Sequence, residues 1–497
     1  MTAITHIPEK FLQEIWKPGN FHHPVKLEND EIIEIQDCGV HNKDIGGPDF
    51  LNARIKIGNF LFTGDVEIDR YSSDWRHHGH HLSKRYNRVI LHVTLEETRG
   101  NRSVFTQDGR KVHEVSINQL LSHSFRDAIR EVLQNSPRSR FGDMICGELI
   151  GHLSSEEVLS YMRELGTQRF IRKSDRILLR FKELCYIVEN QVQEPMISYH
   201  APKEELEKPV TKNQATMKEV WEQLFYELVF EALGYTHNKL VMYRLAQAVP
   251  YKFVKQFSER SDYINLLEAI YFNVSGLIAK DSIPKLEESS DYMRKMTELW
   301  LEVKEMYDGK FFNREDWNFQ KLRPQNFPAI RIAGAARLVN AMANDQLIGR
   351  LIQKVKELQH HPTLINSLKI SMIVKAHGYW KSHFTFDTDT KATIKFFVGS
   401  SRAEEIIVNV LFPYLYTYFS VFNQSGLCRK MLRVYAELEC DPGNKIVIEM
   451  AESLGIKEYA GNALINQGIL QLFREMCTEQ KCEVCRLGRK VFEMDES

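Results

Sequence analysis

A chain of 497 residues is long enough for two to four domains of about 150 residues each. Apolar residues make up 43% and charged residues 26%, a balance that excludes a mainly disordered protein. The net charge of −1 excludes the global basic excess typical of non-specific nucleic-acid binding, so such binding must come from a local patch. The chain begins without the layout of a signal peptide, and the apolar run 406–422 is interrupted by Asn409 and Pro413. We therefore expect a cytoplasmic protein that does not cross a membrane.

The pattern of apolar residues predicts an α+β chain whose two parts differ in kind. Residues 1–120 have the alternation of a small mixed sheet with flanking helices. The expected elements are a helix over 9–16, a strand over 31–38, a hairpin within 46–67, a short helix from 73 toward 81, and a strand over 89–97. From about residue 120 onward the pattern is helical, so we expect an all-α region divided into domains 121–320 and 321–497, the second beginning near the proline-rich segment 322–331.

The hairpin is organised around Gly58-Asn59, a two-residue turn signal between two alternating runs. With this turn, the paired residues on the apolar face are Ile57 and Phe60, Ile55 and Phe62, Ala53 and Gly64, and Leu51 and Val66. The polar face then carries Asn52, Arg54, Lys56, Thr63, Asp65 and Glu67. Asp49 stands at the mouth of the first strand, diagonal to Glu67, so two or three carboxylates converge at one end of the hairpin.

Convergent carboxylates repel one another unless a proton or a cation lies between them. Their oxygens suit Mg²⁺, Mn²⁺ or Ca²⁺, which makes Asp49 and Glu67 candidate metal ligands. The alternative is a polar sheet face whose acids form structural ion pairs with Arg54 and Lys56.

The segment around these acids resembles the PD-(D/E)XK nuclease superfamily. Pro48-Asp49 is similar to its Pro-Asp motif, and Glu67-Ile68-Asp69 on the next strand is similar to its Glu-x-Lys motif. The resemblance implies a helix–three-strand–helix–strand core, Mg²⁺ at Asp49 and Glu67, and a water oriented by Glu14 from the first helix. Asp69 stands at the position of the family's lysine, so Lys84, Arg70 or a nearby histidine would have to replace its charge.

The densest group of histidines is WRHHGHH, residues 75–81, directly after the Glu67 strand. His77 and His81 are four residues apart and would share one face of a helix, although Gly79 weakens that helix. Such histidines can bind a transition metal or donate to a phosphate near the acids, and His78 and His80 are candidate catalytic residues. The alternative is a solvated polar turn.

Basic residues at steps of three and four predict a positively charged face on a helix over 169–180. They are Arg169, Arg172, Lys173, Arg176 and Arg180, and together with Arg54 they are candidate contacts to DNA or RNA phosphates. Exposed basic faces are common, and Asp175 and Glu183 dilute this one.

Three cysteines near the end of the sequence, Cys477, Cys482 and Cys485, have the spacing of a zinc or iron–sulfur site. The segment is similar to the cluster end of helix-hairpin-helix base-excision glycosylases, but no fourth cysteine follows. Cys428, Cys440 or a histidine would have to complete the site. The alternative is three reduced cysteines.

The chain is also similar, end to end, to a bacterial family of uncharacterised proteins. The matching segments are GPDFLNARIKIG, GDVEI, SSDWRHHGHH, YNRVILHV, LRPQNFPAIR and NQGILQLFREMC with its CEVC. No Walker loop, dinucleotide-binding glycine motif, GxSxG or HExxH is present. The sequence thus predicts a nucleic-acid-binding protein that acts as a metal-dependent nuclease. The alternative is a catalytically inactive nucleic-acid-binding or protein-interaction scaffold.

Overall fold

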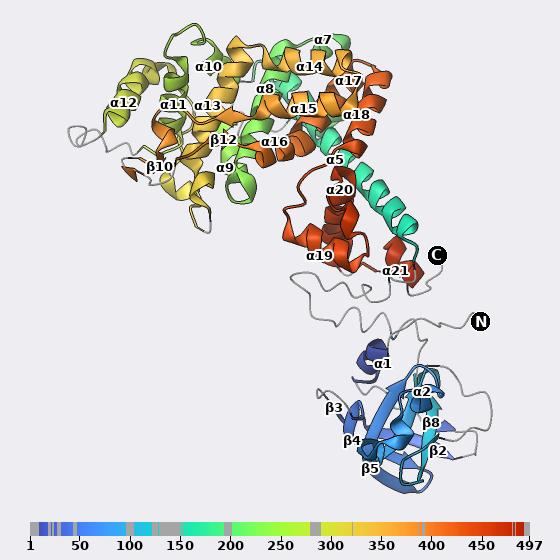
Figure 1. Ribbon diagram of the computed structural model, residues 1–497. Helices are drawn as coiled ribbons and strands as arrows, with labels where there is room; N and C mark the ends of the chain where they lie inside the picture. Colours follow the sequence, from blue (N-terminus) through green and yellow to red (C-terminus); the bar gives the residue numbers. More distant parts are fainter. Residues whose placement is uncertain are drawn as a thin grey trace. The chain divides into compact units, whose positions relative to one another are not determined.

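A computed structural model of the protein describes most of the chain. The described residues are 9–17, 21, 24–26, 31–42, 47–95, 104–121, 128, 150, 153–192, 201–278, 290–320, 322–386, 388–389, 393–479, 481–482 and 484–491. They form two compact units (Figure 1). The first unit comprises 1–163, 443–460 and 468–497, and the second comprises 164–442 and 461–467. These units differ from the three domains 1–120, 121–320 and 321–497, and the second unit continues past residue 320 without division.

The N-terminal sheet of the first unit has the strand order β1-β2-β4-β5-β6-β8-β7, with the short β3 paired to β4. The strand bounds are β1 Val25–Lys26, β2 Ile32–Asp37, β3 Val40–His41, β4 Phe50–Ile57, β5 Phe60–Asp69, β6 Val89–Thr94, β7 Val104–Phe105 and β8 Lys111–Ser116. Strands β4 and β5 form the antiparallel hairpin, whereas β5, β6 and β8 run parallel to one another. This mixed sheet confirms the α+β class.

The register of the β4–β5 hairpin agrees with the prediction near the turn and differs at its far end. Ile57 pairs with Phe60 and Ala53 with Gly64, as expected. Val66, however, pairs with Phe50 and not with Leu51, because the register shifts between Phe50 and Ala53. A bulge explains the shift, with Asn52 at a φ of 58° and its backbone N–H donating to the Asp65 carboxylate over 3.0 Å. The bulge brings Asp49 directly beside Glu67.

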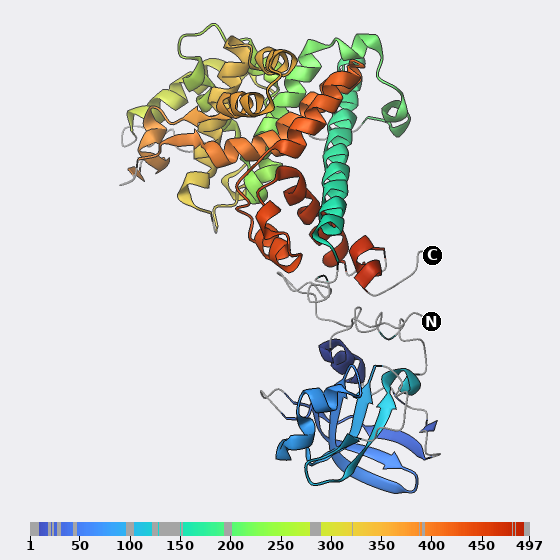
Figure 2. The ribbon, with the colours of Figure 1, turned by 45° about the vertical axis from the view of Figure 1, so that its right-hand side comes forward.

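Both faces of the central strands are covered, which is why polar residues become buried there. The predicted first helix is confirmed as α1, Glu9–Trp16, the dark blue helix next to the sheet (Figure 2). Its Trp16 ring packs against Phe50 with ring centroids 6.4 Å apart. The other cover is the segment from α2, Asp74–His77, through the 3-10 turns η1, His80–Leu82, and η2, Lys84–Tyr86. Its Trp75 packs with Val89, Val104 and Val112. A short helix α3, Ile117–Leu120, follows β8.

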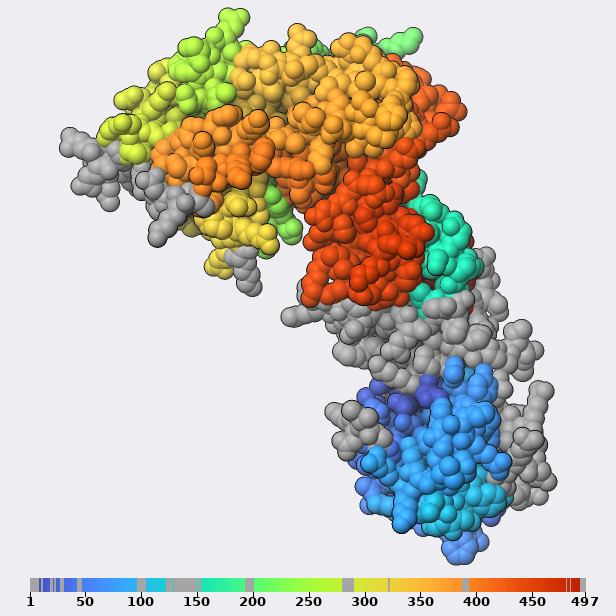
Figure 3. Space-filling view, viewed as in Figure 1, coloured from blue at the N-terminus to red at the C-terminus, as the bar shows by residue number. Residues whose placement is uncertain are grey.

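The helices at the other end of the chain complete the first unit. They are α19 Lys445–Ser453, the second half of α20 Ala463–Leu472, which begins in the second unit and ends in a π-turn over Phe473–Cys477, and α21 Arg486–Val491. The long helix α5, Ser155–Glu189, begins with a capping box, since Glu157 N–H donates to Ser154 Oγ and Ser154 N–H to Glu157 Oε2. Lys490 pairs with Glu157, so α21 lies at the beginning of α5 (Figure 1). Figure 3 shows the same region in space-filling form.

The second unit is a helical bundle with one large hydrophobic core. Its helices are the remainder of α5, then α6 Lys203–Glu207, α7 Lys212–Ala215, α8 Lys218–Leu233, α9 Tyr235–Ala248, α10 Tyr251–Lys255, α11 Tyr263–Val274, α12 Asp291–Val303, α13 Pro328–Asn344, α14 Leu347–Glu357, α15 His361–Met372, α16 Ser400–Ile406, α17 Phe412–Val421 and α18 Ser425–Glu437. The expected all-α character needs one correction. Short strands β9 Val374–Lys375 and β12 Phe396–Val398 pair with each other, as do β10 His383–Thr385 and β11 Thr388–Asp389.

The apolar run 406–422 is buried inside this bundle, as the sequence predicted. It forms the end of α16, a π-turn over Ile407–Leu411 and α17. Among the described helices, none combines the length and the apolar character that crossing a membrane requires.

Candidate metal centre and acidic site

A row of charged side chains crosses the sheet on the face that α2 and η1 cover. Strand β5 places Asp65, Glu67 and Asp69 on this face by simple alternation, and at most 6% of each residue is exposed. The parallel register sets His92 of β6 beside Glu67 and Glu114 of β8 beside His92. Burying so many ionisable groups is costly unless each finds a partner.

Asp49 and Glu67 form an acidic pair at the bulged end of the hairpin. The Asp49 backbone N–H donates to Glu67 Oε2 over 3.1 Å, and the Ile68 backbone N–H donates to Asp49 Oδ2 over 3.0 Å. Burial, followed by the charge of Glu67, raises the pKa of Asp49 to about 8. Burial also raises the pKa of Glu67, although the nearby His80 opposes this rise. The pair is therefore held in place by the backbone while its two charges oppose each other.

Helix α1 supports the acidic pair through Gln13 and not through Glu14. Gln13 Nε2 donates to Asp49 Oδ1 over 2.7 Å. Burial, and then the charge of Asp69, raises the pKa of Glu9 at the beginning of α1. Glu14 instead pairs with Lys17 at the surface, 3.2 Å away, because it lies on another side of the helix. This contact of Glu14 with Lys17 does not support its expected role of orienting a metal-bound water from the first helix.

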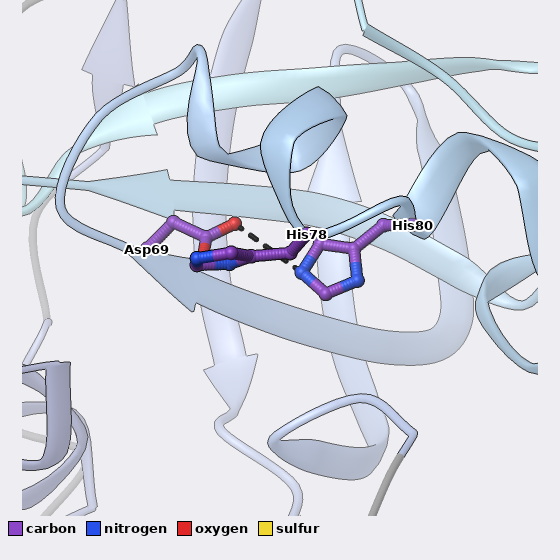
Figure 4. A group of neighbouring side chains, drawn as sticks. All are labelled: Asp69, His78 and His80. Atoms are coloured by element: carbon purple, nitrogen blue, oxygen red, sulfur yellow. Dashed lines mark hydrogen bonds and ion pairs between the residues drawn. The ribbon is translucent and has the colours of Figure 1, made fainter.

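Asp69 is surrounded by imidazoles (Figure 4). His78 Nδ1 lies 3.0 Å from Asp69 Oδ1, and His92 Nε2 lies 3.0 Å from Asp69 Oδ2. His80 Nε2 is 3.7 Å from Asp69 Oδ2 and 3.1 Å from Glu67 Oε1. Burial alone would raise the pKa of Asp69, but His80 and His92 outweigh it and lower this pKa. Burial would lower the pKa of His80, but Asp69 and Glu67 raise it to about 9.

Three of these side chains converge closely enough to hold one metal ion. Asp69, His78 and His80 each offer a ligand atom, and these atoms lie within 4.8 Å of one another (Figure 4). In the described part of the chain, this Asp-His-His cluster is the one group of three or more His, Cys, Asp or Glu that meets this condition. The expectation that at least one histidine of the segment 75–81 lies near the acids is met by this geometry, whereas the catalytic role of His78 and His80 stays a prediction.

The expected pairing of His77 with His81 on one helix face is wrong, because the helix ends too early. Helix α2 ends at His77, and Gly79, with a φ of 77°, turns the chain into η1. His77 remains at the surface, 3.6 Å from Asp74. The left-handed turn at Gly79 brings His78 and His80 to the same side instead.

Two further side chains, His92 and Glu114 on the neighbouring strands, support Asp69, and neither was among the residues predicted from the sequence. His92 is fully buried, and its Nδ1 lies 3.1 Å from Glu114 Oε1, which also accepts a hydrogen bond from Ser72 Oγ over 2.6 Å. Asp69 and then Glu114 raise the pKa of His92 against the effect of burial. The Trp75 ring contacts both His80 and His92, with centroids 5.4 and 5.2 Å apart. A histidine in an otherwise apolar strand is the sequence signal that could have identified His92.

Comparison with known proteins gives one match. Residues 9–200 and 203–443 match the family model described as protein of unknown function (DUF2851). The chain belongs to the DUF2851 family. No curated protein and no solved structure matches the chain. The matched residues include the acidic pair, the Asp-His-His cluster and nearly all of the helical bundle, so these features are parts of a DUF2851 protein.

The basic face predicted on α5 is occupied by contacts within the second unit. Arg176 donates to both carboxylate oxygens of Glu231 over 2.7 and 2.8 Å, and buried Arg180 donates to both of Glu227 over 2.8 and 2.9 Å. Lys173 donates to Asn409 and Gln467, and Arg169 also donates to Gln467. Arg172 remains exposed on this helix. These partners give the basic residues a structural role.

The basic residues of β4 do not pair with the acidic site. Arg54 is exposed on β4, and its neighbour Lys56 lies 3.9 Å from Glu34, so Lys56 pairs away from Asp49 and Glu67.

The sulfurs of the three C-terminal cysteines do not form a metal-binding group among the described residues. Cys477, Cys482 and Cys485 are all reduced, with Cys485 buried and the other two half-buried.

Proposed function

We propose that the N-terminal sheet hydrolyses phosphodiester bonds of DNA or RNA with a divalent cation bound at Asp49 and Glu67. The observation that supports this proposal is the acidic pair itself, formed by two adjacent strands with both carboxylates fixed by backbone N–H groups. Two facing carboxylates in a buried position favour a cation between them. The resemblance to PD-(D/E)XK nucleases supplies the expected reaction and the expected ion, Mg²⁺.

The donor atoms of the pair fit such an ion. Carboxylate oxygens are hard ligands, and each retains lone pairs beyond its single backbone hydrogen bond. A bound divalent ion would lower the pKa of a water and polarise the scissile phosphate. Gln13 keeps Asp49 in one orientation through its 2.7 Å hydrogen bond. Asp69, at the lysine position, cannot supply the positive charge that lysine would give, and the histidines beside it are the nearest replacement.

We assign the contact with nucleic-acid phosphates to a basic hollow of the second unit rather than to α5. The hollow measures about 380 Å³ and is lined by Gln359, His361, Gly426, Leu427, Arg429, Lys430 and Arg433. Lys430 donates to the carbonyls of Val355 and Leu358 at the end of α14 over 2.7 and 2.6 Å, so its role is structural. Arg429 and Arg433 are exposed one turn apart on α18, and neither has an ion pair with a described residue. Such a pair can contact successive phosphates.

The activity can be tested with purified full-length protein and Mg²⁺ or Mn²⁺. We expect cleavage of at least one substrate among single-stranded, double-stranded and branched DNA and RNA. Glu67→Ala should abolish cleavage, and Glu14→Ala should preserve it because Glu14 lies at the surface. Absence of cleavage on every substrate would show that the enzymatic proposal is wrong.

The rival function is nucleic-acid binding without catalysis, and Asp69 at the lysine position favours it. In that case the affinity for DNA or RNA falls with salt while Mg²⁺ produces no turnover. Arg429→Ala with Arg433→Ala should weaken this binding and reduce its salt dependence, and Arg163→Ala serves as an exposed control. A protein-interaction scaffold would show no affinity for nucleic acid at any salt concentration.

A further inference from the structure

We propose that Asp69, His78 and His80 bind a first-row transition-metal ion of the Zn²⁺ type, in a site distinct from the acidic pair. This inference rests on the proposed function in one respect only. The ion would supply the positive charge that the nuclease superfamily obtains from the lysine that Asp69 replaces. The binding site itself depends only on the geometry of the three side chains, and its test does not require activity.

The donor set selects the class of metal. One carboxylate oxygen and two imidazole nitrogens suit Zn²⁺, Mn²⁺ or Fe²⁺, whereas Mg²⁺ prefers an all-oxygen shell. Ligands of Zn²⁺ lie about 2.0–2.2 Å from the ion, so two of them are at most about 4.4 Å apart. The three donor atoms already lie within 4.8 Å of one another. A small closure of the cluster would therefore complete the binding geometry.

An unsatisfied nitrogen points to a ligand that is needed here. His80 is 94% buried, with 6% of its surface exposed, yet its Nε2 makes no hydrogen bond of acceptable geometry. Glu67 Oε1 and Asp69 Oδ2 lie 3.1 and 3.7 Å from this nitrogen, but neither makes a hydrogen bond with it. A buried polar atom without a directed partner is rare and needs an explanation. Coordination of a metal by Nε2 would provide one.

The proposed ligands are themselves held by neighbouring side chains, as the ligands of metal sites usually are. The carboxylate ligand Asp69 lies 3.0 Å from His92 Nε2, and His92 in turn lies 3.1 Å from Glu114. Partners of this kind orient ligands and raise metal affinity. The His80 ring packs against Tyr86 with centroids 4.1 Å apart, which restricts its rotation.

One side of the cluster is open. His78 is exposed, whereas Asp69 and His80 are buried. Three protein ligands with an accessible fourth position are typical of catalytic rather than structural zinc. Glu67 Oε1, 3.1 Å from His80 Nε2, places the acidic pair next to the cluster.

The test is a titration of the chelator-treated, full-length protein with Co²⁺ alone. We expect one equivalent to bind with visible d–d absorption, and Zn²⁺ to displace it, while millimolar Mg²⁺ does not. His78→Ala and His80→Ala should weaken Co²⁺ binding at least tenfold. His77→Ala is the matched control, because His77 is the adjacent histidine and is oriented toward Asp74. His78 is exposed, so its variant should remain folded even if the His80 variant does not.

The outcomes separate this site from the proposed activity. Co²⁺ binding by a Glu67→Ala protein that cleaves nothing would support the metal site whatever the function. Failure of the wild-type protein to bind one equivalent, or an equal loss in His77→Ala and His78→Ala, would overturn the site. Neither result would by itself remove hydrolysis at Asp49 and Glu67.

Discussion

Buried acids occur in both units of this protein, but their negative charges are compensated to different degrees. In the second unit, Glu227 is fully buried and meets the Arg180 guanidinium through two hydrogen bonds of 2.8 and 2.9 Å. In the N-terminal sheet, Glu67 faces the carboxylate of Asp49 and the His80 Nε2 atom, which makes no hydrogen bond. The first acid is fully compensated by the chain. The second is compensated only in part, and this difference is the reason why we propose the sheet, and not the helical pair, as the functional site.

The largest expected effect is the loss of a compensated pair. Arg180→Met leaves Glu227 buried and charged without a partner, so the free energy of unfolding should fall by about 3–5 kcal/mol. Denaturant unfolding followed by far-UV circular dichroism measures this loss. The double variant with Glu227→Leu should recover much of it. Arg163→Met is the control, because its pair with Glu156 is exposed and should contribute less than about 1 kcal/mol.

A smaller loss is expected where a buried histidine supports Asp69. His92→Phe removes the contacts to Asp69 and Glu114, so the free energy of unfolding should fall by about 2–3 kcal/mol. Affinity for Co²⁺ should fall by about 10–100-fold because Asp69 loses its orienting partner. His113→Phe is the control. His113 precedes Glu114 on β8, but its ring faces Glu31 and not Asp69. Equal effects of the two substitutions would contradict a supporting role for His92.

A neutralising substitution in the acidic pair should raise the free energy of unfolding, whereas the substitutions above lower it. Asp49→Asn retains an acceptor for the Ile68 N–H and removes the repulsion with Glu67. In chelator-treated protein, the free energy of unfolding should therefore rise by about 1–2 kcal/mol at neutral pH. Glu227→Gln in the second unit should lower it under the same conditions, because Arg180 loses its counter-charge. A loss of stability in Asp49→Asn would mean that the chain already compensates this carboxylate.

Local patterns predicted the backbone of the site, because they depend on neighbours in sequence. The turn at Gly58-Asn59 and the alternation around it gave the correct pairing from Ile57 to Ala53. The bulge at Asn52 was not predictable from that alternation. It depends on a hydrogen bond to Asp65, thirteen residues further along the chain. That single shift turned a diagonal arrangement of Asp49 and Glu67 into direct neighbours.

Long-range partners explain the predictions that failed or changed meaning. The spacing of basic residues on α5 is real, but Glu227 and Glu231 of α8, about fifty residues away, determine that Arg180 and Arg176 serve the bundle. The histidine segment was assigned helical periodicity through Gly79, although a glycine after one turn is also the usual sign that a helix ends. That reading would have paired His78 with His80 from the sequence alone.

The smallest expected effect tests how the turn at Gly79 builds the cluster. Gly79 has a φ of 77° and open space around it, so Gly79→Ala meets no atom within 4 Å but strains the backbone. Stability should fall by about 1 kcal/mol. Gly109→Ala is a matched control, because Gly109 has a φ of 84°, equally open space, and a position in the turn before β8. Both variants should lose similar stability in denaturant unfolding.

Only Gly79→Ala should change metal binding. His78 and His80 flank Gly79 in the sequence, and both imidazoles reach Asp69. A shift in this turn should therefore separate their donor atoms while leaving each histidine in the chain. We expect at least a tenfold loss of Co²⁺ affinity for Gly79→Ala and none for Gly109→Ala. If Gly79→Ala binds Co²⁺ as tightly as the wild type, the left-handed turn does not organise the Asp-His-His cluster. If both variants bind weakly, the loss reflects general destabilisation of the sheet rather than the geometry of the two histidines.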